Sequence, residues 1–173
     1  MTPALGAALL LLALTGCTVP QPEPTPTAPF TSEEEAFAAA EETYRAYVDA
    51  LNEVDLSDPE TFEEVYAWTT GEANASERKS LSEMHADGWA VSGETRTRAI
   101  FGEELGEDGG VRILVCSDVS AVVVTDAAGT SMVAADRPDV YPLRVELLPS
   151  AQTSTGLVIS ASNAVEEDRC TTS

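Results

Sequence analysis

The first long run of regularly spaced apolar residues lies between positions 33 and 51 and predicts an amphipathic helix. Apolar side chains recur there at the spacing of one helix face; they are Phe37, Ala40, Tyr44, Tyr47, Val48 and Leu51. Ser32 followed by three glutamates is typical of a capping box, in which the serine and the third glutamate bond free amides of the first turn. We therefore expect the folded part of the chain to begin near residue 32.

Two shorter helices are predicted to follow. Asp58 and Pro59 are typical of the N-cap and first position of a helix, and Gly71 is expected to end that helix. Its apolar side would consist of Phe62, Val65, Tyr66 and Trp68. A third helix is expected to run to about Asp87 and to end at Gly88.

From Trp89 onward the spacing changes, and apolar residues alternate with polar ones as they do in a half-buried strand. Strands are predicted over residues 89–101, 111–125, 130–134, 141–148 and 157–165, separated by turns rich in Gly, Asp or Pro. Helices followed by an antiparallel meander indicate an α+β domain, with the helices packed on one face of a sheet of about four to five strands.

This order of elements, from Ser32 to about Cys170, resembles that of the NTF2-like (cystatin-like) superfamily. The resemblance implies a cone, in which a long N-terminal helix and two short helices cover a strongly curved antiparallel sheet. Some members of the superfamily are isomerases, dehydratases or epoxide hydrolases, and many only bind ligands or partners. The resemblance also makes a homodimer through the sheet plausible, but a fold alone does not select a function.

The N-terminus has a separate character. Residues 4–14 are all Ala, Leu or Gly, a run that fits the apolar core of a secretory signal and is too short to cross a bilayer. The following Leu14-Thr15-Gly16-Cys17 resembles the lipobox of bacterial lipoproteins, and the chain is similar to uncharacterised lipoproteins of high-GC Gram-positive bacteria. The alternative is an ordinary cleaved signal with an incidental cysteine.

The lipobox resemblance implies cleavage before Cys17 and acylation of that residue, so that lipid, such as palmitate, would hold the protein in the outer leaflet of the cell membrane. The expected organisation is a signal peptide over residues 1–16, a lipidated cysteine and proline-rich tether over 17–31, and one domain over 32–173. The location would be extracytoplasmic.

Cys116 and Cys170 are the remaining cysteines, an even pair in an oxidising setting, and we expect them to form a disulfide. A thiol nucleophile or a pair of metal ligands is the alternative. That alternative is weaker because the sequence has no C-x-x-C pair and His85 is its only histidine. No metal and no cofactor are expected.

The chain is strongly acidic, with 9 basic against 30 acidic residues and a formal net charge of -21. Residues 33–72 contain Arg45 as their only base. Such a surface argues against nucleic acid and anionic lipid headgroups as partners, since both require basic surface. It is interpreted first as a solvated face that keeps the domain soluble, and second as a binding surface for cations or a basic partner.

Charged residues also share one face of the predicted strands, where arginines and carboxylates would form an array on the side away from the core. Its arginines are Arg96, Arg98, Arg112 and Arg144. Exposed cross-strand ion pairs are the simpler interpretation. The alternative is a docking surface for an acidic or peptidoglycan-linked partner in the cell envelope, because arginine forks bind carboxylates well.

Catalytic motifs are absent from the sequence, which has no G-x-S-x-G, no H-E-x-x-H and no phosphate loop. If the cone contained a pocket, its candidate residues would be Tyr44, Tyr47, Trp68, His85, Trp89 and Asp118, although aromatic residues at helical spacing more often belong to a core. The leading hypothesis is a non-enzymatic binding or accessory domain of the cell envelope. The alternatives are a carrier or sensor of a small hydrophobic ligand and an NTF2-like lyase or isomerase.

Overall fold

The computed structural model describes residues 30–170. Their helices are α1 (Glu33–Asn52), α2 (Phe62–Ala67) and α3 (Gly71–Ala86), with short 3-10 helices η1 (Pro59–Thr61) and η2 (Asp168–Cys170). The strands are β1 (Ala90–Ser92), β2 (Arg96–Leu105), β3 (Val111–Asp118), β4 (Val123–Thr125), β5 (Val140–Pro149) and β6 (Leu157–Ala164). The predicted signal peptide, Cys17 and all of the predicted tether before residue 30 lie outside the described residues.

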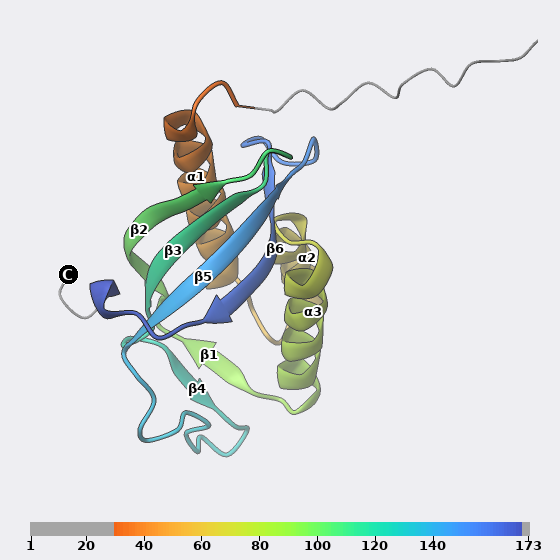
Figure 1. The fold of residues 1–173 in the computed structure, drawn as a ribbon. Helices are drawn as coiled ribbons and strands as arrows, with labels where there is room; N and C mark the ends of the chain where they lie inside the picture. Colours follow the sequence, from red (N-terminus) through yellow and green to blue (C-terminus); the bar gives the residue numbers. More distant parts are fainter. Residues whose placement is uncertain (1–29, 171–173) are drawn as a thin grey trace, which may run out of the picture.

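Four antiparallel strands form the main sheet in the order β2-β3-β5-β6, and α1 crosses one face of this sheet (Figure 1). Helix α3 runs beside β6. Strands β1 and β4 pair separately as a two-stranded sheet at the lower end of the molecule in Figure 1. The structure confirms the expected α+β class, with the helices packed on a curved antiparallel sheet of four strands.

Helix α1 forms where the hydrophobic spacing predicts it. The hydroxyl of Ser32 accepts a hydrogen bond from the amide of Glu35 at 3.2 Å, as an N-cap does. The carboxylate of Glu35 instead accepts from the amide of Thr31 at 2.9 Å, one residue earlier than in a standard capping box. The two side chains thus fix the start of the helix and the direction of the chain that enters it.

The main core fills the space between α1 and the four-stranded sheet. Its buried members are Ala36, Ala40, Tyr44, Val48, Ala73, Val111, Ile113, Val115, Val145, Leu147, Leu157 and Ile159. The helix approaches so closely that a Cβ on Gly102 of β2 would lie 2.5 Å from the ring of Phe37. The interior of the cone is therefore packed with side chains from both layers.

Gly71 begins a helix and does not end one, which corrects the sequence prediction. Helix α2 ends at Ala67, and α3 begins at Gly71 in a left-handed conformation with φ +53°. Thr70 is the extended N-cap of α3, and its amide donates to the carbonyl of Ile159 at 2.8 Å. A contact with β6, distant in sequence, thus decides which helix the glycine belongs to.

Two of the predicted strands are each divided in two. The run over residues 89–101 breaks into β1 and β2 at Gly93, and the run over 111–125 breaks into β3 and β4. Gly93 has φ +79°, and a Cβ there would lie 2.0 Å from the carbonyl oxygen of Ala121. Only glycine permits this close approach. At this point both segments of the chain, the one that contains β1 and β2 and the one that contains β3 and β4, leave the main sheet.

The strand predicted over residues 130–134 is wrong, because this segment makes only an isolated bridge between Ser131 and Thr125. The carboxylate of Asp126 accepts hydrogen bonds from the amides of Ala128 and Thr130 at 2.9 and 2.8 Å. These bonds stabilise a turn and compete with strand pairing. Within residues 30–170, no helix is both long and apolar enough to cross a membrane.

Candidate functional site

Three of the predicted pocket residues belong to packed parts of the domain. Tyr44 is 2% exposed and lies in the main core, and Tyr47 packs against that core beside it, with ring centroids 5.8 Å apart. Trp68 follows α2, and its carbonyl accepts a hydrogen bond from the amide of Ile159 at 3.0 Å. The structure thus brings the two tyrosines together as core residues.

A carboxylate that sequence reasoning missed points inward to the tyrosines. The hydroxyl of Tyr47 donates to Oε1 of Glu77, on α3, at 2.5 Å. Burial raises the pKa of Tyr44 to about 12 and raises the pKa of Tyr47 well above its usual value. Burial also raises the pKa of Glu77, although the bond from Tyr47 opposes that shift. The bond between Tyr47 and Glu77 joins α1 to α3.

Replacing Glu77 with glutamine is expected to stabilise the domain at neutral pH and to remove part of the pH dependence of its stability. Because the pKa of Glu77 is raised in the folded state, the folded chain holds more protons than the unfolded chain between the two pKa values. Stability therefore falls as pH rises through that window and stays lower above it. Urea unfolding from pH 4 to pH 8 (roughly the range that spans a raised carboxyl pKa) measures this slope.

The matched control is Glu83→Gln, an exposed carboxylate on the same helix. It should leave the slope unchanged. A Glu77→Gln variant with the wild-type pH profile would contradict the assignment of Glu77 as a buried, destabilising charge. Glutamine is a suitable replacement because its amide oxygen can still accept the bond from Tyr47.

His85 and Trp89 lie near a second, smaller core. The Nδ1 atom of His85 is 2.6 Å from the carbonyl oxygen of Leu56, and the imidazole packs edge-on against Phe62, with centroids 6.3 Å apart. Trp89 is half-buried against the same cluster. The structure therefore separates these two residues from Tyr44 and Tyr47, which pack in and against the main core.

Asp118 faces away from the cone. Its carboxylate accepts from the amide of Ser120 at 2.9 Å and from Nε of Arg98 at 2.7 Å. The bonds from Ser120, followed by the bond from Arg98, lower the pKa of Asp118 to about 2. Its geometry is that of a permanently charged ion-pair partner, whereas a general base needs a pKa nearer to the working pH.

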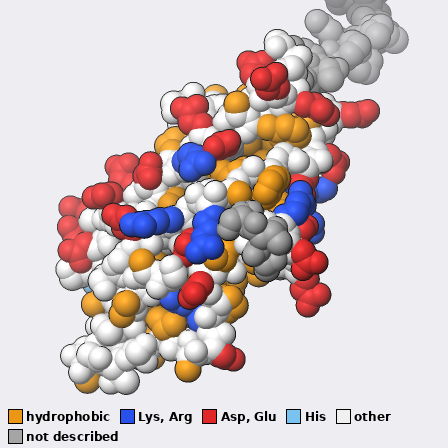
Figure 2. Space-filling model, turned by 90° about the vertical axis from the view of Figure 1, so that its left-hand side faces the viewer, with side chains coloured by type: hydrophobic (Ala, Val, Ile, Leu, Met, Phe, Trp, Pro, Cys, Tyr) orange, Lys and Arg blue, Asp and Glu red, His pale blue; other side chains and the backbone are white. Residues whose placement is uncertain are grey.

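The expected arginine-carboxylate array lies on the sheet face opposite α1, which we call the outer face. Figure 2 shows basic side chains across the middle of this view with acidic side chains around them. Besides Arg98–Asp118, the pairs include Arg112 with Glu104, and Arg144 with Glu103 at 3.0 Å. Since each of these arginines already has a carboxylate partner, the outer face is largely neutralised. Its role as a docking surface stays a prediction.

Arg96 does not join the cross-strand array. Its ion-pair partner is Glu94 at 3.7 Å, and both side chains are about two-thirds exposed or more. Arg96 lies opposite Asp118 in the ladder, but a bulge between Thr97 and Ala99 makes Arg98 an extra residue of β2. Of these two arginines with equal parity in the sequence, Arg98 pairs with Asp118 at 2.7 Å.

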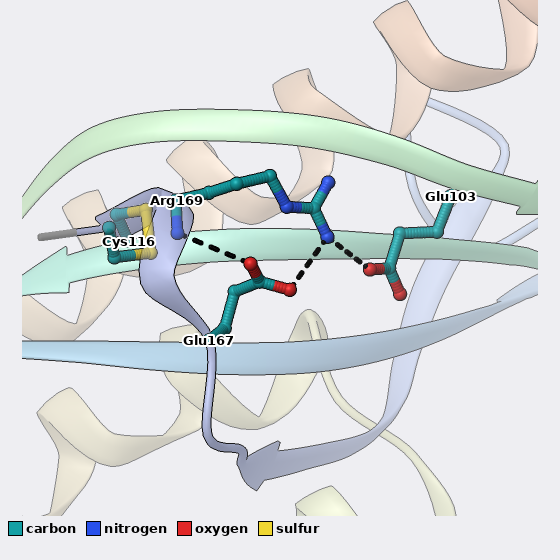
Figure 3. The surroundings of a disulfide bond; sticks show 5 residues. Glu103, Cys116, Glu167 and Arg169 are labelled. Carbon is teal, nitrogen blue, oxygen red and sulfur yellow. Dashed lines mark hydrogen bonds and ion pairs between the residues drawn. A yellow bond between two sulfur atoms is a disulfide. The ribbon is translucent and has the colours of Figure 1, made fainter. Parts of the chain in front are cut away.

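Cys116 and Cys170 lie at disulfide-bonding distance, with Sγ atoms 1.93 Å and Cα atoms 5.3 Å apart. The bond holds η2 against the outer face of β3 (Figure 3). Beside it, the guanidinium of Arg169 lies between Glu167 and Glu103, at 3.0 and 2.9 Å. The pKa of Glu167 is lowered to about 2, chiefly by Arg169. Covalent and ionic contacts thus attach the C-terminal segment at one place.

A further feature that the sequence analysis missed is an apolar cavity of about 350 Å³, which we call the basal cavity. It lies where the C-terminal end of α1 meets α3 and the small β1–β4 sheet. Its lining residues are Leu51, Asn52, Val54, Leu56, Leu81, Met84, Val91, Ser92, Gly93, Thr95, Val122 and Val124. The valines at positions 91, 122, 123 and 124 were the available signal, but they also fit strands of one continuous sheet.

Residues 30–170 contain no group of three or more His, Cys, Asp or Glu side chains placed to hold a metal ion. The same residues offer apolar surface in the basal cavity and charged surface around the molecule.

No protein-family model matches the sequence, and no curated protein matches it. Among solved structures, the domain is similar to the intermembrane space region of the chloroplast protein ARC6, with a TM-score of 0.52, 13% identity, and coverage of 76% of this chain and 97% of that one. It is also similar to a protein from Catenulispora acidiphila, with a TM-score of 0.51, 17% identity, and coverage of 82% and 98%. These likenesses concern the fold, which is NTF2-like.

Proposed function

We propose that this protein is a membrane-anchored, extracytoplasmic lipoprotein whose domain acts as a non-enzymatic binding or accessory module of the cell envelope. The observation that carries the proposal is the filled interior between α1 and the sheet, where Tyr44, Ile113 and Val145 are at most 2% exposed. An NTF2-like enzyme works in an open chamber at that place. The lipobox-like Leu14-Thr15-Gly16-Cys17 and the bonded Cys116–Cys170 pair support an oxidising location.

A carrier of a small hydrophobic ligand is the second candidate, favoured by the basal cavity and its apolar wall. A lyase or isomerase has less support. Asp118 pairs with Arg98 on the outer face, and the inward carboxylate of Glu77 is bonded to Tyr47 within packed side chains. Neither carboxylate faces open space in the manner of a general base.

Replacing Cys17 with serine is expected to release the protein from the membrane. Two or three acyl chains anchor a protein far more firmly than one, so the loss of the acylated residue should move the chain from the membrane fraction to the soluble fraction or the medium. Expression in a lipoprotein-processing bacterium, with fractionation and labelling by a palmitate analogue, measures both effects.

The matched control is Thr18→Ser, which makes a small change beside the cysteine and should leave the chain labelled and membrane-bound. A Cys17→Ser protein that still fractionated with membranes and lost no acyl mass would contradict the anchoring proposal. That outcome would not test the binding role of the domain, which is measured separately with its ligands.

A further inference from the structure

The basal cavity has a wall without charged side chains, and its polar lining residues are Asn52, Ser92 and Thr95. The amide nitrogen of Asn52 donates a hydrogen bond to the carbonyl of Thr95 at 3.0 Å, and its oxygen accepts from the amide of Thr95 at 2.9 Å. The buried Leu56 and Leu81 belong to the smaller core and form part of the lining. Water in such a cavity finds few partners, so an apolar group would displace it favourably.

One side of the cavity is accessible from solvent. Val91 is 41% exposed, and its partner in the β1–β4 ladder is Val124, which also lines the cavity. Val91 and Val124 thus present apolar surface at the opening of the cavity.

Carboxylates flank the cavity on two sides. A cleft of about 490 Å³ shares Asn52 with it and is lined by Asp49, Glu53, Glu64 and Glu94. On the other side, a second cleft shares Met84 with the cavity and is lined by Glu83 and Asp87. Among residues 30–170, Glu94 is the one member of these six that forms an ion pair, a loose contact of 3.7 Å with Arg96.

We propose that the basal cavity binds a segment of a partner protein in which a large apolar side chain is flanked on both sides by lysine or arginine. The apolar side chain fills the cavity, and the flanking bases contact the carboxylates of the two clefts. This inference rests on the proposed binding function and adds the chemistry of the partner. Because carboxylates lie in two clefts beside the cavity, they favour an extended peptide segment with basic residues before and after the apolar side chain that enters the cavity.

Other occupants fit less well. A second copy of this chain has a formal charge of -21 and would bring mostly acidic surface toward an acidic rim. An anionic lipid or acid would be repelled for the same reason. A neutral apolar molecule would fill the cavity but would leave the surrounding carboxylates without a role, and it is an outcome that the experiment distinguishes.

The test uses the full-length chain in phosphatidylcholine nanodiscs and a fluorescently labelled synthetic peptide, Arg-Lys-Gly-Leu-Gly-Lys-Arg. Its controls replace the leucine with serine or the four bases with glutamine. We expect the parent peptide to bind at least about tenfold more tightly than either control, since both parts of the contact are required. Empty nanodiscs measure the background, and raised salt should weaken the binding.

Two changes in the protein locate the contact. Val91→Phe enlarges an exposed strand side chain that lines the cavity, and Glu53→Gln with Glu64→Gln neutralises part of the rim. Each is expected to weaken peptide binding by about tenfold. The matched control is Glu34→Gln with Glu42→Gln, which removes the same charge from exposed positions nearer the other end of α1 and should change little.

If Glu34→Gln with Glu42→Gln weakened peptide binding as much as Glu53→Gln with Glu64→Gln, the proposal would be overturned. That result would indicate that the peptide is attracted to any acidic surface of the protein. Absence of peptide binding, or undiminished binding by Val91→Phe, would overturn it as well. If the neutral dye N-phenylnaphthylamine binds the cavity and the peptide does not, the occupant is a small apolar molecule. Should Val91→Phe fail to fold, Val91→Lys places a repelling cation at the same opening. Release of the Cys17→Ser protein from the membrane is measured in a separate experiment. Membrane anchoring and peptide binding can therefore fail independently.

Discussion

Replacing Cys170 with serine is expected to lower the free energy of unfolding of the domain by about 4 kcal/mol. The disulfide joins residues 54 positions apart, and the chain-entropy model assigns a cross-link of that length about this much stabilisation through the unfolded state. Cys116 is fully buried, so the variant also leaves an unpaired thiol in a packed site. Urea unfolding under non-reducing conditions measures the difference.

The control is Ser162→Ala, at an exposed position on β6, the strand that precedes η2. It should alter the free energy of unfolding by less than about 0.5 kcal/mol. Reduction of the wild-type protein should reproduce most of the loss, because it breaks the same bond. Two reactive thiols in the folded, unreduced domain would contradict the disulfide.

Replacing Ile113 with alanine is expected to cost about 4 kcal/mol, the second large effect. Ile113 is 0% exposed at the centre of β3 and faces α1 across the main core. Removing its branched side chain forfeits hydrophobic transfer energy and leaves a cavity that a packed core closes only in part. The matched control is Val123→Ala, since Val123 is 47% exposed and its truncation should have little effect.

This change also tests the filled interior on which the proposed function depends. If the cone is packed in the wild type, xenon or benzene should bind measurably to the Ile113→Ala variant and not to the wild type, as small apolar ligands do in engineered cavities. A wild-type domain that already accepted such ligands between α1 and the sheet would contradict the packed interior and favour a carrier. Binding at the basal cavity is distinguished with the Val91→Phe variant, in which that cavity is filled.

The helices were largely predictable because their signals are local. Ser32 forms the expected N-cap, and Tyr44 and Val48 occupy the expected buried face. Gly71 was assigned to the wrong helix because a bond from Thr70 to Ile159, a residue far along the chain, determines where α3 begins. A glycine in the sequence indicates that the chain turns, but long-range contacts decide which element it borders.

The strands were located in the sequence but their grouping was not. Alternation continues through Gly93 almost without interruption, so one strand was expected where the structure has β1 and β2 in different sheets. The close approach of Gly93 to Ala121 is a contact between separate segments, and no periodicity reports it. For the same reason the basal cavity could not be predicted, since it exists only because the two short strands leave the main sheet.

The features of the candidate site that depend on residue type and strand alternation could be predicted from the sequence. Counting cysteines indicated the bonded pair, and parity along the strands indicated that arginines and carboxylates share one face of the sheet. The inward carboxylate of Glu77 was missed because α3 has a weak apolar pattern, so its buried face is not apparent from spacing. Its environment depends on the docking of α3 against α1.

The burial of β3 has a consequence for how the domain opens. Val111 and Ile113 are covered by α1, while Leu114 and Cys116 are buried on the opposite face, and the strand pairs with β2 and β5 on its two sides. Amide hydrogens in such a strand exchange with solvent only when the whole structure unfolds, whereas those of the exposed β1 and β4 exchange through small local openings. Exchange rates along β3 would therefore report the global stability of the molecule residue by residue.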